Sequence, residues 1–170
     1  LYSLKGDNDS RCKTKDGSII DLYANINSND ELTHINVHGL QGVGLYRTEF
    51  LYINNGLLSE DEQYEIFKQA AISMQSKPLT IRTFDLGGDK ISKYMPKTVE
   101  ENPALGLRAI RYSMKYADFF TSQIRSILRA GVYGDIRLLL PMISSIDELL
   151  EVKSIIEQEK KRLHEMNIPY

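Results

Sequence analysis

Short apolar segments alternate with longer helical patterns four times along these 170 residues, and this alternation restricts the possible folds more than any other feature. The predicted strands cover residues 18–26, 42–47, 79–84 and 135–140, and a stretch with helical signals follows each of them. Successive βα units with short apolar strands form parallel sheets whose connections are right-handed crossovers. The sequence therefore predicts an α/β protein built on a parallel sheet.

Capping residues and glycines set the boundaries of the predicted helices and turns. The predicted helices cover residues 30–38, 59–75, 104–130 and 145–164. Asp30 is the expected N-cap of the first helix and Gly39 its end, and a break is expected near Ala117 in the third. The second and fourth helices begin with capping boxes, a serine followed three residues later by a glutamate. Asp16-Gly17 is a hairpin turn signal that pairs residues 11–14 with the first predicted strand.

A (β/α)8 barrel is the parent fold that these units indicate. Such a barrel usually needs about 250 residues, so we expect a TIM-barrel fragment: the first four βα units in residues 18–170, preceded by an N-terminal segment and hairpin strand in residues 1–17. An open doubly wound sheet is the alternative. Half a barrel exposes two sheet edges, and unpaired edges recruit partners. We therefore expect residues 1–170 alone to dimerise, exchange strands or be marginally stable unless a neighbour completes them.

Two segments repeat one pattern, in which an apolar run leads into an Arg-Thr pair and then an acidic residue. The segments are VGLYRTEFL at 43–51 and LTIRTFDL at 79–86. Arg47 and Arg82 should therefore stand at the ends of two strands, about 10 Å apart or less if the strands are near neighbours. Two guanidinium groups there can grip a doubly anionic ligand, because each offers donors in a flat fork that matches phosphate or carboxylate oxygens. The alternative is structural: each arginine pairs with the neighbouring Glu49 or Asp85.

The loop after the third predicted strand and the next helix add further cations. DLGGDK at 85–90 places two glycines beside Lys90, so that the backbone can pass close to a ligand. ENPALGLRAIR at 101–111 places Arg108 and Arg111 on the opening turns of a helix, where a cation opposes the helix dipole. That position calls for a bound anion or a carboxylate, and the glutamates at 100 and 101 are the candidates for the carboxylate.

Composition limits where an anion can bind. Lysine and arginine total 21 against 23 acidic residues, a net charge of −2, so no overall field draws the chain to nucleic acid or to anionic lipid. No apolar stretch approaches the about 20 residues that span a bilayer. The single cysteine, Cys12, excludes an internal disulfide and fits a reducing compartment, so a cytoplasmic location is expected. Any anion site must be local.

VGLYRTEFL, IRTFDLGGDK and ENPALGLRAIR occur in this order, with LLLPMIS following. Together they resemble the phosphoenolpyruvate-binding barrel of the enzyme I family, the phosphoenolpyruvate-protein phosphotransferases of the bacterial sugar phosphotransferase system. The resemblance covers nearly the whole chain. Phosphoenolpyruvate (PEP) synthase and pyruvate phosphate dikinase share the first arginine and the NPxLGxR element, and they remain alternatives, as does a non-catalytic anion-binding module. The RTEFL and GGDK sequences are closer to enzyme I than to either of these two enzymes.

The resemblance implies an enzyme that transfers the phosphoryl group of PEP to a histidine on a separate domain and on to a small phosphocarrier protein. It assigns PEP binding to Arg47, Arg82 and Arg108. The residues expected to support them are Thr48, Asp85, Lys90 and Asn102. It also implies Mg²⁺ as cofactor and a homodimer.

The family's metal ligands, proton-donating cysteine and phosphorylated histidine have no match in this chain. The resemblance places the metal ligands and the cysteine beyond Tyr170, and the histidine on an N-terminal domain. We therefore expect no catalytic residue and no metal ligand within residues 1–170. On their own, these residues should be inactive.

Overall fold

The computed structural model describes residues 12–86 and 106–170. Four strands form one sheet: β3 (Tyr23–Ile26), β4 (Gly42–Arg47), β5 (Leu79–Arg82) and β6 (Ile136–Leu139). They lie side by side in chain order, and every neighbouring pair is parallel. The predicted α/β fold with a parallel sheet is confirmed, and its shape is consistent with part of a barrel.

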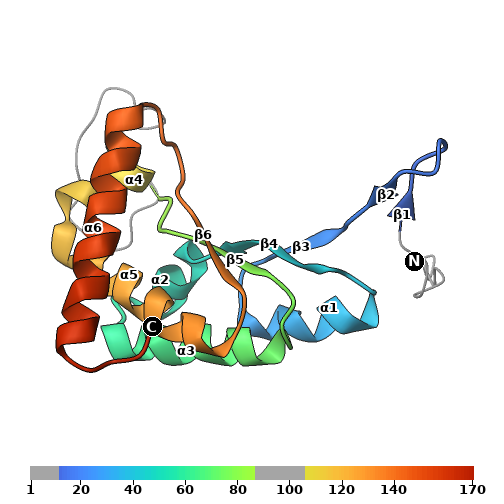
Figure 1. Ribbon diagram of the computed structural model, residues 1–170, viewed down its shortest axis with the longest axis horizontal. Helices are drawn as coiled ribbons and strands as arrows, with labels where there is room; N and C mark the ends of the chain where they lie inside the picture. Colours follow the sequence, from blue (N-terminus) through green and yellow to red (C-terminus); the bar gives the residue numbers. More distant parts are fainter. Residues whose placement is uncertain (1–11, 87–105) are drawn as a thin grey trace.

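The helices of the described residues pack on one another and on one face of this sheet (Figure 1). They are α1 (Thr33–Val37), which follows the 3₁₀ turn η1 (Asn29–Leu32), α2 (Glu49–Asn55), α3 (Glu60–Ser73), α4 (Ala109–Lys115), α5 (Ala117–Ala130), which leads into the 3₁₀ turn η2 (Gly131–Tyr133), and α6 (Ile146–Glu165). The predicted break near Ala117 is present, because Tyr116 leaves the helical conformation with a ψ of 67° between α4 and α5.

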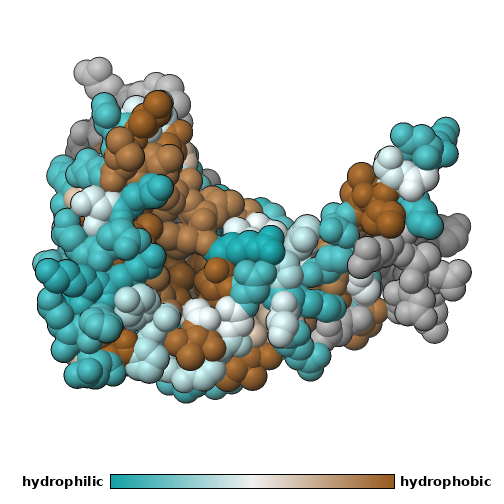
Figure 2. All heavy atoms as spheres, viewed as in Figure 1, coloured by the Kyte–Doolittle hydropathy of each residue, from teal (hydrophilic) through white to brown (hydrophobic). Residues whose placement is uncertain are grey.

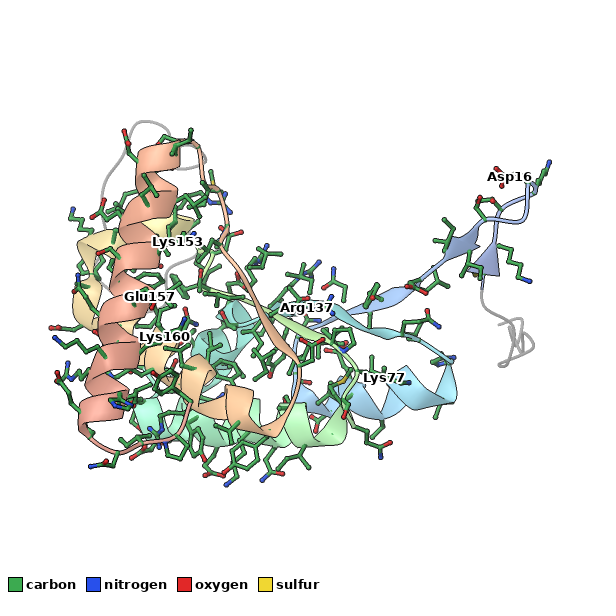
Figure 3. The ribbon with its side chains drawn as sticks, in the orientation of Figure 1. Asp16, Lys77, Arg137, Lys153, Glu157 and Lys160 are labelled. Atoms are coloured by element: carbon green, nitrogen blue, oxygen red, sulfur yellow. The ribbon has the colours of Figure 1, made fainter. Side chains whose placement is uncertain are left out.

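The first predicted strand, 18–26, is split between two sheets. Ile19–Ile20 forms β2 and pairs antiparallel with β1 (Cys12–Lys13), whereas only β3 joins the main sheet. The reason lies at Leu22, whose backbone N–H donates to the side chain of Gln41 (2.7 Å) and whose carbonyl accepts from the Gln41 N–H (2.9 Å). The predicted hairpin is present and projects from the body, with Asp16 at its tip (Figures 1 and 3).

Two helical details differ from the sequence-based expectations. Ser28, and not Asp30, is the N-cap residue of η1, in extended conformation. Helix α2 had no counterpart among the predicted helices. Its run of Phe50, Leu51, Tyr52 and Ile53 includes aromatic and β-branched residues that are common in strands, and it carries no signal for the start of a helix. Helix α2 directly follows β4, and it therefore carries the acidic residue of the RTEFL motif.

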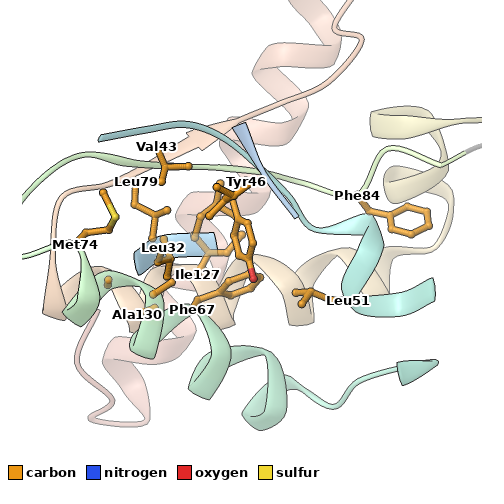
Figure 4. Close-up of a cluster of buried hydrophobic side chains, with 14 of the residues drawn as sticks. Leu32, Val43, Tyr46, Leu51, Phe67, Met74, Leu79, Phe84, Ile127 and Ala130 are labelled. Carbon is orange, nitrogen blue, oxygen red and sulfur yellow. The ribbon is translucent and has the colours of Figure 1, made fainter. Parts of the chain in front are cut away.

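The main core lies between the sheet and the helices (Figure 4). Tyr46 of β4 and Phe67 of α3 are both fully buried, and their rings meet edge to face with centroids 6.1 Å apart. The Tyr46 hydroxyl donates to the Asn29 side chain at 3.0 Å, so its polar end has a partner. In β5, Leu79 and Ile81 are buried in this core. Because side chains alternate along a strand, Thr80 and Arg82 belong to the opposite face of the sheet.

The capping box of α3 gives the first testable prediction. The Ser59 side chain accepts from the Glu62 N–H, and the Glu62 carboxylate accepts from the Ser59 N–H (2.8 Å). Ser59→Ala should therefore lower the free energy of unfolding by about 1 kcal/mol, measured by urea denaturation. Ser73→Ala is the matched control at the other end of α3, where the hydroxyl only donates back to Gln69, and it should stay within about 0.5 kcal/mol of wild type. Equal losses in the two variants would contradict the prediction.

Candidate anion site at the strand ends

Arg47 and Arg82 lie directly opposite each other at the carboxyl ends of β4 and β5. The two residues are register partners across this parallel pair, and neighbouring strands lie about 4.8 Å apart. The residues before them, Tyr46 and Ile81, are also register partners and are fully buried against the helices. Both arginines therefore belong to the face of the sheet away from the main core. The sequence-based expectation that they stand near each other at two strand ends is confirmed.

Arg82 is held by two carboxylates. Its Nη2 lies 2.7 Å from Glu49 Oε1, and its Nη1 lies 3.1 Å from Asp85 Oδ2. The Arg82 side chain is 20% exposed and that of Glu49 only 4%. The ion pair that the sequence left open as an alternative is therefore present at Arg82, with both of the acidic residues that follow the two Arg-Thr pairs.

Arg108 joins the same group through Asp85. It is the N-cap residue of α4, in extended conformation, and its Nη2 lies 3.0 Å from Asp85 Oδ1. Asp85 thus places one carboxylate oxygen on Arg82 and the other on Arg108. The expected carboxylate partners of Arg108 at positions 100 and 101 lie outside the described residues. Arg111 does not join this group and contacts Glu148 of α6 at 3.4 Å.

Arg47 is held much less firmly than Arg82. Among the described residues its guanidinium makes one hydrogen bond, from Nη1 to Asn27 Oδ1, and this bond spans 3.5 Å. Within residues 12–86 and 106–170, no carboxylate lies within ion-pair distance of this guanidinium. Asn27 follows β3 directly, so a third strand end contributes to the site. Asn27 was not among the predicted site residues, although its position directly after a predicted strand is a signal for a place at the strand ends.

Arg47, Arg82 and Arg108, here called the arginine cluster, carry three positive charges against the two negative charges of Glu49 and Asp85. Within this group of five side chains, three buried polar atoms lack a hydrogen-bond partner among the described residues: Arg82 Nε, Arg108 Nε and Glu49 Oε2. Two of the three are donors. The site therefore has an excess of positive charge and of unused N–H groups, and both favour an anion with several acceptor oxygens.

The structure describes two of the four residues expected to support the cluster, Thr48 and Asp85. Thr48 is fully buried, and its hydroxyl donates to the backbone carbonyl of Arg82 at 2.9 Å, which joins the ends of β4 and β5. Asp85 bridges two arginines, as described above. Lys90 and Asn102 lie outside the described residues. Gln123 of α5 also contacts Thr48, at 3.3 Å, and the sequence offered no signal for it beyond its place in a helical pattern.

The described residues do not assemble a metal site. No group of three or more His, Cys, Asp or Glu side chains in this part of the chain could hold a metal ion. Both acidic residues at the strand ends are already engaged by arginines, so they do not fit a Mg²⁺ ion. A search of the same residues for helices long and apolar enough to cross a membrane finds none.

Burial raises the pKa of the Glu49 carboxyl above its usual 4.5, although Arg82 opposes the shift. A carboxyl whose pKa is raised on folding binds more protons in the folded state. Its contribution to the free energy of unfolding is therefore greatest below pH 4.5 and is lost as pH rises through the folded pKa. Glu49→Gln removes this titration. The unfolding free energy of the variant minus that of wild type should therefore increase with pH, measured by urea denaturation from pH 4 to 8.

Glu62 supplies a control of opposite sign, because its hydrogen bonds to Ser59 lower the pKa of its carboxyl. Its contribution is present above pH 4.5 and is lost as pH falls through the folded pKa. For Glu62→Gln, the unfolding free energy of the variant minus that of wild type should decrease as pH rises. The interpretation of Glu49 would be wrong if both variants followed the wild-type pH dependence.

Comparison with known proteins places this arrangement in a family. Residues 3–170 match the family described as PEP-utilising enzyme, PEP-binding domain. Phosphoenolpyruvate-protein phosphotransferases of Latilactobacillus sakei, Geobacillus stearothermophilus and Bacillus subtilis are 44%, 43% and 41% identical to this chain over 151 residues. These alignments cover 88% of this chain and 26% of each relative, so the chain spans about a quarter of their length. With a family match that extends over nearly all of its residues, this chain belongs to the PEP-binding domain family of PEP-utilising enzymes.

Proposed function

We propose that this chain forms part of the PEP-binding domain of a phosphoenolpyruvate-protein phosphotransferase and that the arginine cluster binds the phosphoryl group. The observation that carries the proposal is the register pairing of Arg47 with Arg82 at two parallel strand ends. The names of the relatives favour this reaction over those of PEP synthase and pyruvate phosphate dikinase. The family membership supports PEP as the anion.

The chemistry of the cluster fits a transferring phosphoryl group. Phosphoryl transfer spreads negative charge over three equatorial oxygens, and fixed cations that face these oxygens lower the barrier without reorganisation. Among the described residues, Arg47 makes one long hydrogen bond, and Arg82 and Arg108 each have an Nε–H donor without a partner. Glu49 and Asp85 hold Arg82 and Arg108 in place. These contacts support a role in binding and orienting the substrate.

The rest of the reaction requires residues outside this chain. The proposed acceptor is a histidine on a separate domain, from which the phosphoryl group passes to a small phosphocarrier protein. A Mg²⁺ ion, when bound in the complete enzyme, would stabilise the carboxylate and developing enolate of the substrate. The Mg²⁺ ligands and the proton donor are proposed to lie outside the described residues, so residues 1–170 alone should be catalytically inactive.

We further propose that the sheet is the first half of a (β/α)8 barrel. The exposed apolar residues of α6 support this, since Ile146 and Leu150 are 76% and 57% exposed. Figure 2 shows an apolar surface that extends from α6 toward the sheet. Between α5, β6 and α6 lies an apolar pocket of about 380 Å³. Further βα units would pair with the end strand β6 and cover this surface. The complete protein is proposed to be a cytoplasmic homodimer.

The test of the function is product formation by the complete natural protein. It should release pyruvate from PEP and become phosphorylated on a histidine, detected as acid-labile, base-stable phosphate on the protein. A non-catalytic anion-binding module would bind PEP without releasing pyruvate, and that outcome would refute the proposal.

A further inference from the structure

The side chain of Gln123 in α5 is fully buried and contacts Thr48 and Phe84, which follow Arg47 and Arg82 of the arginine cluster in the chain. We propose that Gln123 is a positioning residue that sets the relative placement of Arg47 and Arg82 and thereby the affinity of the cluster for a phosphoryl group. The inference rests on the proposed function, because it assigns Gln123 a role in that same site. The Gln123 side chain bonds to Phe84, Thr48 and Tyr52 and not to the three arginine side chains, so its effect must pass through the backbone.

Gln123 contacts both arginine-bearing segments at once. Its Oε1 accepts the backbone N–H of Phe84 at 3.0 Å, two residues after Arg82. Its Nε2 donates to the hydroxyl of Thr48 at 3.3 Å, and Thr48 directly follows Arg47. The same hydroxyl donates onward to the backbone carbonyl of Arg82. One side chain from α5 therefore fixes the two strand ends relative to each other and to the helix layer.

The orientation of this amide is determined by its neighbours. Because the Phe84 N–H can only donate, it must face the Gln123 oxygen, and the amide NH₂ must then face two hydroxyls. These belong to Thr48 and to Tyr52, whose oxygen lies 3.2 Å from Gln123 Nε2. Each hydroxyl accepts from Gln123 and donates further, Thr48 to Arg82 and Tyr52 to Gln63. A buried network in which each member has its partner holds one geometry, since any rotation of the amide breaks several bonds.

Gln123→Met is the informative substitution because methionine keeps the length and volume of the side chain but has no amide. It leaves the Phe84 N–H without its acceptor and the Thr48 hydroxyl without its donor, and the two strand ends lose their common anchor. Displacements of about 1 Å in a binding site can lower reaction rates by about 100-fold. For the smaller shift expected here, the dissociation constant for the anion should rise on the order of tenfold.

Gln63 of α3 is a matched control within the same network. It is also a buried glutamine, and its side chain also bonds to Tyr52, at 2.8 Å, with a second bond to the Leu58 carbonyl at 3.1 Å. These hydrogen bonds reach Tyr52 of α2 and the Leu58 carbonyl but not β4, β5, Thr48 or Phe84. Gln63→Met should therefore lower stability as Gln123→Met does, but without weakening anion binding.

The experiment measures binding of PEP and of inorganic phosphate to the complete natural protein by calorimetry. Wild type is compared with Gln123→Met, Gln63→Met and Thr48→Val at a temperature where circular dichroism shows all of them folded. We expect weaker binding of both ligands by Gln123→Met and Thr48→Val, and wild-type binding by Gln63→Met. The double variant Gln123→Met/Thr48→Val should lose less affinity than the sum of the two single losses, because both changes remove the Gln123–Thr48 contact.

The outcomes separate this inference from the proposed function. Wild-type affinity in Gln123→Met would overturn the positioning role and leave the function intact. Equal weakening in Gln63→Met would also overturn it, because general loss of packing would then explain the effect. Failure of wild type to bind either ligand would instead refute the proposed function. If Gln123→Met does not fold, Thr48→Val decides, and unchanged affinity in that variant counts against the inference.

Discussion

Replacing Arg82 by alanine is expected to lower the free energy of unfolding by about 3 to 5 kcal/mol, the usual consequence of removing one partner from a buried charge pair. The Arg82 guanidinium lies 2.7 Å from Glu49 and 3.1 Å from Asp85. The Glu49 side chain is 4% exposed, and its second carboxylate oxygen already lacks a partner among the described residues. After the substitution Glu49 would be buried without a cation, a state more costly than the lost contact itself. Urea denaturation at pH 7 measures the change.

The double variant Arg82→Ala/Glu49→Gln tests the reason for this loss. If unpaired charge is the cause, neutralising Glu49 should restore part of the lost stability, although the same Glu49→Gln change removes the ion pair from wild type. Arg82→Ala should bind PEP less tightly as well. A stable Arg82→Ala variant that loses only ligand affinity would show that the ion pair has little structural importance.

Arg47→Ala should have the opposite profile. The free energy of PEP binding should weaken by about 2 kcal/mol, within the range for a charge-assisted hydrogen bond. Stability should change by less than about 0.5 kcal/mol, because the substitution leaves no buried charge unpaired. In the part of the chain that the structure describes, the guanidinium of Arg47 has a single long hydrogen bond, to Asn27 at 3.5 Å. Calorimetric titration with PEP and urea denaturation of the same sample give both quantities.

Arg137→Ala is the matched control for Arg47→Ala. Arg137 lies in β6 (Figure 3), and its side chain is 54% exposed and paired with Asp135, the residue before this strand. The substitution Arg137→Ala removes an arginine of the sheet that is not part of the arginine cluster, so PEP affinity should remain at the wild-type value. Comparable loss of affinity in the two variants would mean that PEP responds to overall charge, and the assignment of Arg47 would be wrong.

Local sequence patterns were sufficient for the order of the four strands of the main sheet and for helices α3 and α6, because apolar runs and capping boxes act within a few residues. The split of residues 18–26 was not predictable, since it depends on Gln41, which takes both backbone groups of Leu22 from another part of the chain. Helix α2 was missed because aromatic and β-branched residues at 50–53 suit either a strand or a helix. Contacts distant in sequence decided both cases.

The candidate site was predicted in outline for a similar reason. Repetition of an Arg-Thr pair followed by an acidic residue was enough to place Arg47 and Arg82 together, because parallel strands end at one edge. The pattern could not show which arginine pairs with a carboxylate, since Glu49 and Asp85 each follow an arginine at short range. The structure gives both acids to Arg82 and leaves Arg47 with Asn27. Gln123 carried no signal, because a buried glutamine in a helix has many possible partners.

The unequal restraint of the two strand-end arginines has a thermodynamic consequence. Ordering a long side chain such as arginine costs up to about 2 kcal/mol of conformational entropy. Arg82, held by two carboxylates, loses this freedom when the chain folds. Arg47, with one long hydrogen bond, keeps more of it until an anion arrives. The contact made by Arg47 should therefore appear in calorimetry as favourable enthalpy partly offset by entropy, whereas Arg82 meets the anion already ordered.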